Sequence, residues 1–276
     1  ERSIKRHKVS SKFISCLPYE KGHKSEVEYI IVEGDSAGGR AATARAKYQC
    51  ILGIRGKSLN VHKASVDKLV ANSEIRDIIM SLGCGIDLGI EGYESFDISK
   101  LKVGKIFFLA DADIDGKHIL MLLFLIFYKL FPELLYQGYV YIIDPPLYTI
   151  NTKDGRAIYC MDDNEFKEKQ EEIGYGNILS TDRFKGLGET SAEDLWNTTL
   201  DPEKRHIRQI KLARNDTELV DVIEVLFGKS TERRKRAILG ELMEDFDGVM
   251  SEIESVSDAV SRMNLDDDLD VEEVLV

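Results

Sequence analysis

Residues 105–116 read KIFFLADADIDG and join a run of apolar side chains to an acidic turn. Residues 29–39, YIIVEGDSAGG, follow the same plan, with an apolar run that ends in a glycine-rich acidic turn. Each turn is followed by residues that favour a helix, so both stretches predict a strand, a turn and a helix in that order. Strands that alternate with helices predict an α/β fold built on a mostly parallel sheet.

Outward from these stretches, two more apolar runs predict strands, so we expect about four strands in the sheet. One is Gln49–Ile54, and the other covers residues 139–143 and ends at two prolines, which cannot continue a regular strand. Helices are expected over residues 40–47 and 65–80 and from His118 onward. The apolar run at 119–130 is shorter than the roughly 20 residues that span a bilayer, so a buried helix is expected there.

After residue 150 the sequence changes to short polar segments and then to helical patterns. Asp201-Pro202-Glu203 resembles a helix start, Asp216 predicts a second start, and residues 231–250 predict a longer helix. The expected organisation is a basic lead-in (1–26), a core (27–150), an extension (151–200), a helical tail that docks on a partner (201–262) and an acidic disordered tail (263–276).

The composition predicts a globular protein with an uneven distribution of charge. The hydrophobic content of 43% is enough for a sizeable core, whereas the net charge of −12 by itself argues against nucleic-acid binding. Basic residues crowd the first part of the chain and acids crowd its last part, so local patches can still be basic. The four cysteines are widely spaced, without a C-x-x-C pair, which predicts a reducing compartment such as the cytoplasm. Residues 1–12 lack the apolar stretch of a signal peptide.

Four acids, Glu33, Asp111, Asp113 and Asp115, follow the ends of predicted strands. In open α/β sheets the carboxyl ends of the strands line the functional crevice, so these acids are expected to meet. Carboxylates within about 4 Å repel each other by roughly 1 to 4 kcal/mol per pair, and such a cluster normally holds a cation. Hard oxygen ligands indicate Mg²⁺.

Other interpretations of the acidic turn start from its spacing. Asp111, Asp113, Asp115 and Gly116 match the opening of an EF-hand, but Leu122 stands where that loop requires a glutamate, and a strand precedes it. A surface turn of unpaired acids fits the same spacing. Residues 56–58, GKS, resemble the end of a nucleotide-binding loop, yet the required upstream glycine is absent.

Several motifs together resemble the B subunits of type IIA DNA topoisomerases, the family of DNA gyrase and topoisomerase IV. They are EGDSAGG (33–39), RGKSLNV (55–61), DADIDGKH (111–118), PPLY (145–148), KGLGE (185–189) and LWNTTLDP (195–202). Their order matches too, and the resemblance covers about residues 12 to 240. It implies a TOPRIM fold, a Rossmann-like parallel sheet flanked by helices, with a C-terminal helical appendage.

The resemblance also implies a site. Glu33 and Asp111 would hold the catalytic Mg²⁺, Asp113 would help a second ion, and Asp115 would support them, with Mn²⁺ or Ca²⁺ able to substitute. Glu33, Asp111 and Asp113 would be the catalytic residues. Proton transfer by Glu33 would require a pKa above that of an ordinary glutamate. Contacts to DNA are expected from Asp35, Ser36, Arg55, Lys57, Asn60, Lys63, His118 and Lys185.

The implied partners are double-stranded DNA and a topoisomerase A subunit in an A₂B₂ assembly. The A subunit would supply the nucleophilic tyrosine, because Tyr29, Tyr128 and Tyr141 look like core residues. ATP would enter only through an ATPase domain that this chain does not contain. Two alternatives stay open: another TOPRIM enzyme, such as a primase or a nuclease, or a non-catalytic Mg²⁺-stabilised assembly module. The first lacks the SAGG and KGLGE motifs that are present here.

Overall fold

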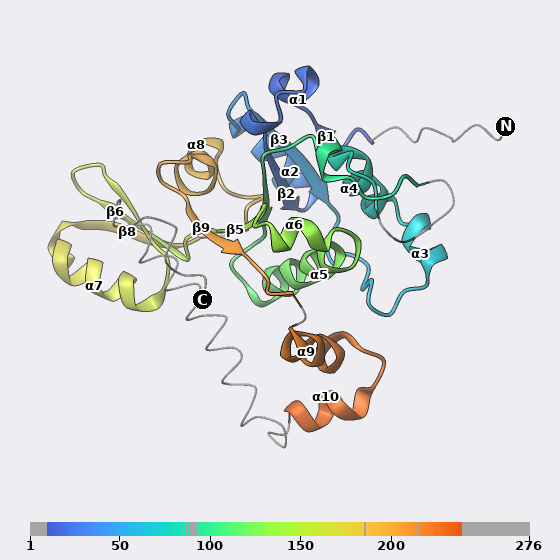
Figure 1. Cartoon of the computed structure of the whole chain (residues 1–276). Coiled ribbons are helices and arrows are strands. Elements are labelled where there is room, and N and C mark those ends of the chain that lie inside the picture. Colours follow the sequence, from blue (N-terminus) through green and yellow to red (C-terminus); the bar gives the residue numbers. More distant parts are fainter. Residues whose placement is uncertain (1–9, 87, 89–92, 185, 215, 239–276) are drawn as a thin grey trace, which may run out of the picture. The chain divides into compact units, whose positions relative to one another are not determined.

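The structure, a computed structural model, describes residues 10–86, 88, 93–184, 186–214 and 216–238. The chain divides into two compact units between Leu212 and Ala213. The first unit contains every strand that the structure describes, and the second contains helices (Figure 1).

In the described part of the first unit, a six-stranded sheet has the order β1-β3-β2-β4-β5-β9. Its strands are β1 (Phe13–Ile14), β2 (Glu28–Glu33), β3 (Gln49–Ile54), β4 (Lys105–Leu109), β5 (Val140–Asp144) and β9 (His206–Ile210). The strands β3, β2, β4 and β5 are parallel, and β1 and β9 are antiparallel to their neighbours. The predicted α/β fold with four parallel strands is therefore confirmed, and two edge strands extend it.

The strand order contains a switch point between β2 and β4. From β2 the chain crosses to β3 on one side, and later places β4 on the other side. Ligands of open α/β sheets bind at such a point, outside the carboxyl ends of the two strands. This topology singles out the ends of β2 and β4.

Helices cover both faces of the main sheet. Those of the first unit are α1 (Leu17–Lys21), α2 (Asp35–Ala44), α3 (Val66–Ala71), α4 (Ser73–Leu82), α5 (Ile114–Leu130), α6 (Pro132–Tyr136), α7 (Asp163–Ile173) and α8 (Ala192–Leu195). Alternate residues of β2 point to opposite faces, as the strand period requires. Ile30 packs with Ala37 and Ala41 of α2, whereas the Tyr29 hydroxyl bonds to Ser81 of α4.

Helix α2 lies unusually close to β3. A Cβ built on Gly38 of α2 would lie 3.1 Å from the Cα of Gly53 in β3, which is tighter than ordinary packing. Glycine at these two positions therefore allows the helix that follows Glu33 to rest directly on the sheet.

The apolar run at 119–130 lies inside α5, as predicted. Most of its side chains are buried, although Met121 is exposed, and Phe127 packs edge-on against Phe108 of β4, with ring centroids 5.0 Å apart. Among the described residues, no helix has the length and apolar character needed to cross a membrane.

A second, antiparallel sheet was not foreseen from the sequence. Its strands are β6 (Tyr148–Thr152), β7 (Ala157–Cys160) and β8 (Ile178–Arg183), in the order β7-β6-β8. Helix α7 packs on it through Phe166, whose ring stacks on Tyr148 at 4.4 Å. This sheet lies to the left of the main sheet in Figure 1. It accounts for much of the extension predicted over residues 151–200.

The prediction of a helix that begins at Asp201 is wrong. Asp201 ends a π-helical turn (Trp196–Leu200) that continues α8, and β9 follows it. Asp201 and Pro202, which resemble a helix start, instead lie in the turn that joins the π-helical turn to the edge strand β9. Residues 201–212 therefore belong to the compact unit with the sheets rather than to a helical tail.

The helix predicted over 65–80 is two helices, because Asn72 interrupts it. The Asn72 side chain accepts a hydrogen bond from the Ile75 N–H at 3.0 Å and caps α4. In the second unit, the start predicted at Asp216 is confirmed, since Asp216 caps α9 (Thr217–Phe227). Helix α10 (Thr231–Ile238) begins at the predicted residue, and the rest of the helix predicted to residue 250 lies outside the described residues.

Candidate functional site

Glu33 and Asp111 meet at the switch point. Glu33 is the last residue of β2, and Asp111 follows the end of β4, its parallel neighbour. The backbone N–H of Asp111 donates to Glu33 Oε2 at 3.2 Å. The two acids that the sequence predicted to lie together are therefore in direct contact.

Asp113 and Asp115 extend this acidic edge into the start of α5. Asp113 caps the helix, and its Oδ1 accepts a hydrogen bond from the Gly116 N–H at 2.7 Å. Asp115 is exposed and pairs with Lys57, whose Nζ lies 2.8 Å from Oδ1. The EF-hand interpretation fails here, because a strand precedes the acids and Leu122 is buried in the core.

Residues 186–190, which we call the glycine loop, reach the same edge from the second sheet. The Leu187 N–H donates to Asp111 Oδ1 at 2.8 Å, and the Leu187 side chain is buried in the main core. A Cβ built on Gly186 would lie 2.8 Å from Asp111 Oδ2. The loop therefore holds one oxygen of Asp111 and, having no side chain at Gly186, leaves space beside the other.

The surroundings of Glu33 disfavour its charged form. Partial burial raises the pKa of Glu33 above its usual value, and the negative charges of Asp111, Asp113 and Asp115 raise it further. The hydrogen bond from the Asp111 N–H opposes this rise in pKa. The direction agrees with the property that proton transfer by Glu33 would require.

The chemistry of these side chains fits a hard divalent cation. One oxygen of each of Glu33, Asp111 and Asp113 accepts a backbone hydrogen bond, and the other oxygens have no such bond from the described residues. In the described ranges, no three acidic, histidine or cysteine side chains already converge on one point. The carboxylate oxygens of these acids, at the ends of neighbouring strands, are the ligand type that Mg²⁺ prefers.

Two of the basic residues predicted to contact DNA, Arg55 and Lys57, are paired with acids beside this edge. The Arg55 Nε lies 2.8 Å from Asp35 Oδ2, and Lys12 also approaches Asp35, at 3.4 Å. This contact with Arg55 is the largest factor that lowers the pKa of Asp35. Lys57 pairs with Asp115, as described above. Both cations therefore neutralise acids near the site.

The structure describes four of the other residues predicted to contact DNA. Ser36, Lys63 and His118 are exposed. The Asn60 side-chain oxygen accepts a hydrogen bond from the His62 N–H, two residues further along the chain, at 3.1 Å. Lys185 lies outside the described residues.

The sequence did not single out Arg183, the last residue of β8. Arg183 and Lys117 line one open hollow of about 400 Å³ together with residues 112–115. This hollow joins the acidic edge to the second sheet. The only sequence signal was a basic residue shortly before the KGLGE motif, and nothing in that motif assigns the residue to this hollow.

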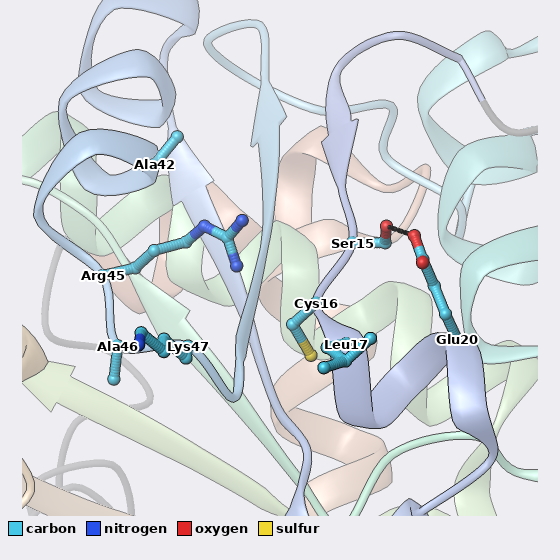
Figure 2. A pocket seen from close by; sticks show the side chains of 8 residues that line it. All are labelled: Ser15, Cys16, Leu17, Glu20, Ala42, Arg45, Ala46 and Lys47. Carbon is cyan, nitrogen blue, oxygen red and sulfur yellow. Dashed lines mark hydrogen bonds between the residues drawn. The ribbon is translucent and has the colours of Figure 1, made fainter.

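A second hollow lies at the opposite edge of the main sheet. Figure 2 shows its lining, with Arg45 and Lys47 on one side, Cys16 and Leu17 on the other, and Glu20 hydrogen-bonded to Ser15 beyond them. These residues precede β3 or adjoin its start, so they are far along the strands from Glu33. The Cys16 and Cys50 sulfurs lie 3.1 Å apart there as buried free thiols, although the two cysteines are far apart in the sequence.

Comparison with known proteins agrees with this geometry. Residues 28–145 match the model of the Toprim domain, and residues 177–239 match the model described as DNA gyrase B subunit, carboxyl terminus. The DNA gyrase B subunit of Thermotoga maritima is 45% identical over 219 residues, which cover 78% of this chain and 33% of that protein. The gyrase B subunits of Thermus thermophilus and Archaeoglobus fulgidus are each 40% identical, over 77% and 78% of this chain and 33% and 32% of their own lengths.

The parallel sheet with acids at its switch point defines a Toprim domain. The chain belongs to the family of DNA gyrase B subunits, in the type IIA topoisomerases, and corresponds to their Toprim-containing carboxyl-terminal part. It spans about a third of the length of the curated relatives that it matches.

Proposed function

We propose that this chain supplies the Mg²⁺-binding half of a DNA cleavage centre. With a tyrosine-bearing A subunit in an A₂B₂ assembly, it makes and reseals a transient double-strand break in DNA, in the bacterial cytoplasm. The observation that carries the proposal is the contact between Glu33 and Asp111 at the switch point, held from the second sheet by the Leu187 N–H.

Each acid has a proposed role that follows from its surroundings. Glu33 and Asp111 hold the first Mg²⁺, Asp113 helps a second ion, and Asp115 supports the edge from the first turn of α5. A bound Mg²⁺ supplies electrostatic stabilisation of the charge that develops on the phosphate and on the leaving oxygen. Because its pKa is raised, Glu33 can also give a proton to the leaving 3′ oxygen when the strand is cut and take it back from the 3′ hydroxyl when the break is resealed.

The nearby cations answer the objection raised by the negative net charge. Arg55 and Lys57 lie beside the acidic edge, where they offset its negative charge and are placed to contact phosphate oxygens. Asp35, Ser36, Asn60, Lys63, His118 and Lys185 complete the proposed DNA contacts. The A subunit supplies the remaining basic surface and the tyrosine, and ATP acts through a separate domain.

The experiment that tests this function is reconstitution. The chain, a tyrosine-bearing A subunit and supercoiled DNA are mixed with Mg²⁺, trapped with detergent and assayed for DNA that is covalently linked to protein. We expect such complexes only when both proteins and the metal are present. Complete absence of linked DNA in an assembled mixture contradicts the proposal.

The same assay separates the alternatives. A nuclease of the Toprim class would nick DNA without the A subunit and leave no protein attached. A non-catalytic assembly module would form the complex with the A subunit and DNA without giving cleaved product. Both outcomes differ from the Mg²⁺-dependent covalent complex that we expect.

A further inference from the structure

The hollow between α5 and β8 carries two cations that the proposed DNA contacts do not include. Lys117 lies in the first turns of α5, and Arg183 ends β8 on the second sheet. Both side chains are exposed. They come from segments far apart in the sequence, and the fold places them on the lining of one hollow beside Asp113 and Asp115.

Arg183 and Lys117 differ from Arg55 and Lys57 in having no acidic partner in the part of the chain that the structure describes. Arg55 and Lys57 are bound to Asp35 and Asp115 at 2.8 Å. Among the described residues, no carboxylate lies within ion-pair distance of Arg183 or Lys117, although Asp113 and Asp115 line the same hollow. The two charges are therefore available to an anion from outside the chain.

The backbone fixes the position of Arg183. Arg183 pairs with Tyr148 in the β8–β6 register, and the next residue, Phe184, donates its N–H to the Leu147 carbonyl at 2.7 Å. Shortly afterwards the chain is tied to Asp111 through Leu187. Arg183 is thus anchored on both sides, between the second sheet and the acidic edge.

We propose that Arg183 and Lys117 form a binding seat for a backbone phosphate of duplex DNA, next to the acidic edge. A guanidinium group can bind two phosphate oxygens at once, and a lysine adds a point charge. Ile114 lines the same hollow with 85% of its surface exposed. This apolar side chain could contact a deoxyribose of DNA, whereas a free inorganic anion would gain nothing from it. The inference rests on the proposed function only for the choice of DNA as the substrate.

The second sheet thereby acquires a role in binding. Strand β8 of this sheet places the phosphate-binding Arg183 beside the acidic edge, and the glycine loop that follows the strand holds Asp111. The seat would engage DNA without a divalent ion, because both cations belong to the chain itself.

The test is binding of a short fluorescent DNA duplex to the full chain, measured by anisotropy in EDTA over a range of salt concentrations. Arg183→Gln and Lys117→Gln should each weaken binding by about tenfold at low salt and lower the slope of log K against log salt by about 1. Arg183→Lys should keep the slope, because it keeps the charge. Thermal melting identifies any variant that has lost its fold. If Arg183→Gln does not fold, the binding of Lys117→Gln alone decides whether the seat exists.

Matched controls come from the same sheet. Arg156 and Lys153 are exposed residues near the β6–β7 turn, away from the hollow, and Arg156 pairs with Asp154. Arg156→Gln and Lys153→Gln should bind the duplex like the wild type. Equal weakening by the controls, wild-type binding by both seat variants, or no binding by the wild-type chain would each overturn the seat. Binding of inorganic phosphate can be measured with the same variants. If Arg183→Gln weakens phosphate binding but leaves duplex binding unchanged, the assignment of the seat to DNA is overturned.

Failure of this inference can be told apart from failure of the proposed function. If the seat variants bind DNA normally while the wild-type chain and its partner form covalent complexes, only the seat is lost. If the seat variants bind DNA weakly but no covalent complex ever forms, the seat stands and the cleavage function is lost.

Discussion

Glu33 is held in a place where a negative charge is costly. It is partly buried at the end of β2, three aspartates lie nearby, and one backbone N–H partly compensates. We expect Glu33→Gln to keep the size and hydrogen bonding of the side chain while removing its charge. Folding and assembly should survive, and Mg²⁺-dependent cleavage should fall by about 10²-fold or more.

The measurement is the yield of covalent DNA complexes at matched concentrations, with size-exclusion profiles to show that both proteins assemble with the A subunit. Cleavage near the wild-type level would mean that Glu33 is not catalytic. Loss of assembly together with cleavage would indicate a structural role for Glu33 instead.

Asp111 and Asp113 give a second prediction, which requires no partner. Clustered carboxylates repel one another until a cation joins them, so Mg²⁺ or Ca²⁺ should raise the melting temperature of the chain. Asp111→Asn with Asp113→Asn should abolish this rise, whereas Glu168→Gln on the exposed surface of α7 should retain it. A rise that persists in the double variant would place the metal site elsewhere.

At the level of elements, β9 is secured by two ion pairs that differ in burial. Just before β9, Arg205 binds both oxygens of Glu28 at 2.6 and 2.8 Å and lies over the Phe107 ring, with only 3% of its side chain exposed. Within β9, Arg208 binds both oxygens of Asp144 at 2.6 and 2.7 Å but is 38% exposed. The two arginines form a natural comparison.

Arg205→Ala should lower the free energy of unfolding by about 3 kcal/mol, because it removes the cation from the largely buried Glu28 carboxylate and leaves the neutral Gln49 amide as its hydrogen-bond donor. Arg208→Ala should cost about 1 kcal/mol or less, because water replaces much of that interaction. Urea unfolding followed by circular dichroism measures both. Equal losses for the two variants would show that burial does not control the strength of these pairs.

At the level of the whole molecule, the tyrosines considered as nucleophiles are parts of the core. Tyr29 is fully buried, and Tyr128 and Tyr141 are half-buried in α5 and β5. We therefore expect the isolated chain neither to cut nor to relax plasmid DNA at any Mg²⁺ concentration, while addition of the A subunit restores cleavage. Gel assays of supercoiled plasmid measure this, and relaxation by the pure chain would show that it carries its own nucleophile.

The sequence alone determined the parallel core and the acids at its edge. Apolar runs such as Gln49–Ile54 are buried on both faces, so their composition is unmistakable, and each ends in a glycine or acidic turn. The carboxyl ends of neighbouring parallel strands must share one edge, so the meeting of Glu33 and Asp111 followed from the pattern. The motifs supplied the family.

Only the tertiary structure revealed the second sheet, β9 and the place of Arg183. Strand β8 is almost entirely exposed and β9 is an exposed edge strand, so neither shows the alternation of apolar and polar residues that marks a half-buried strand. Their strands form because neighbouring backbones offer hydrogen bonds, which are contacts between residues far apart in the chain. For the same reason, the contact between Leu187 and Asp111 and the hollow shared by Lys117 and Arg183 depend on long-range packing, which no local pattern encodes.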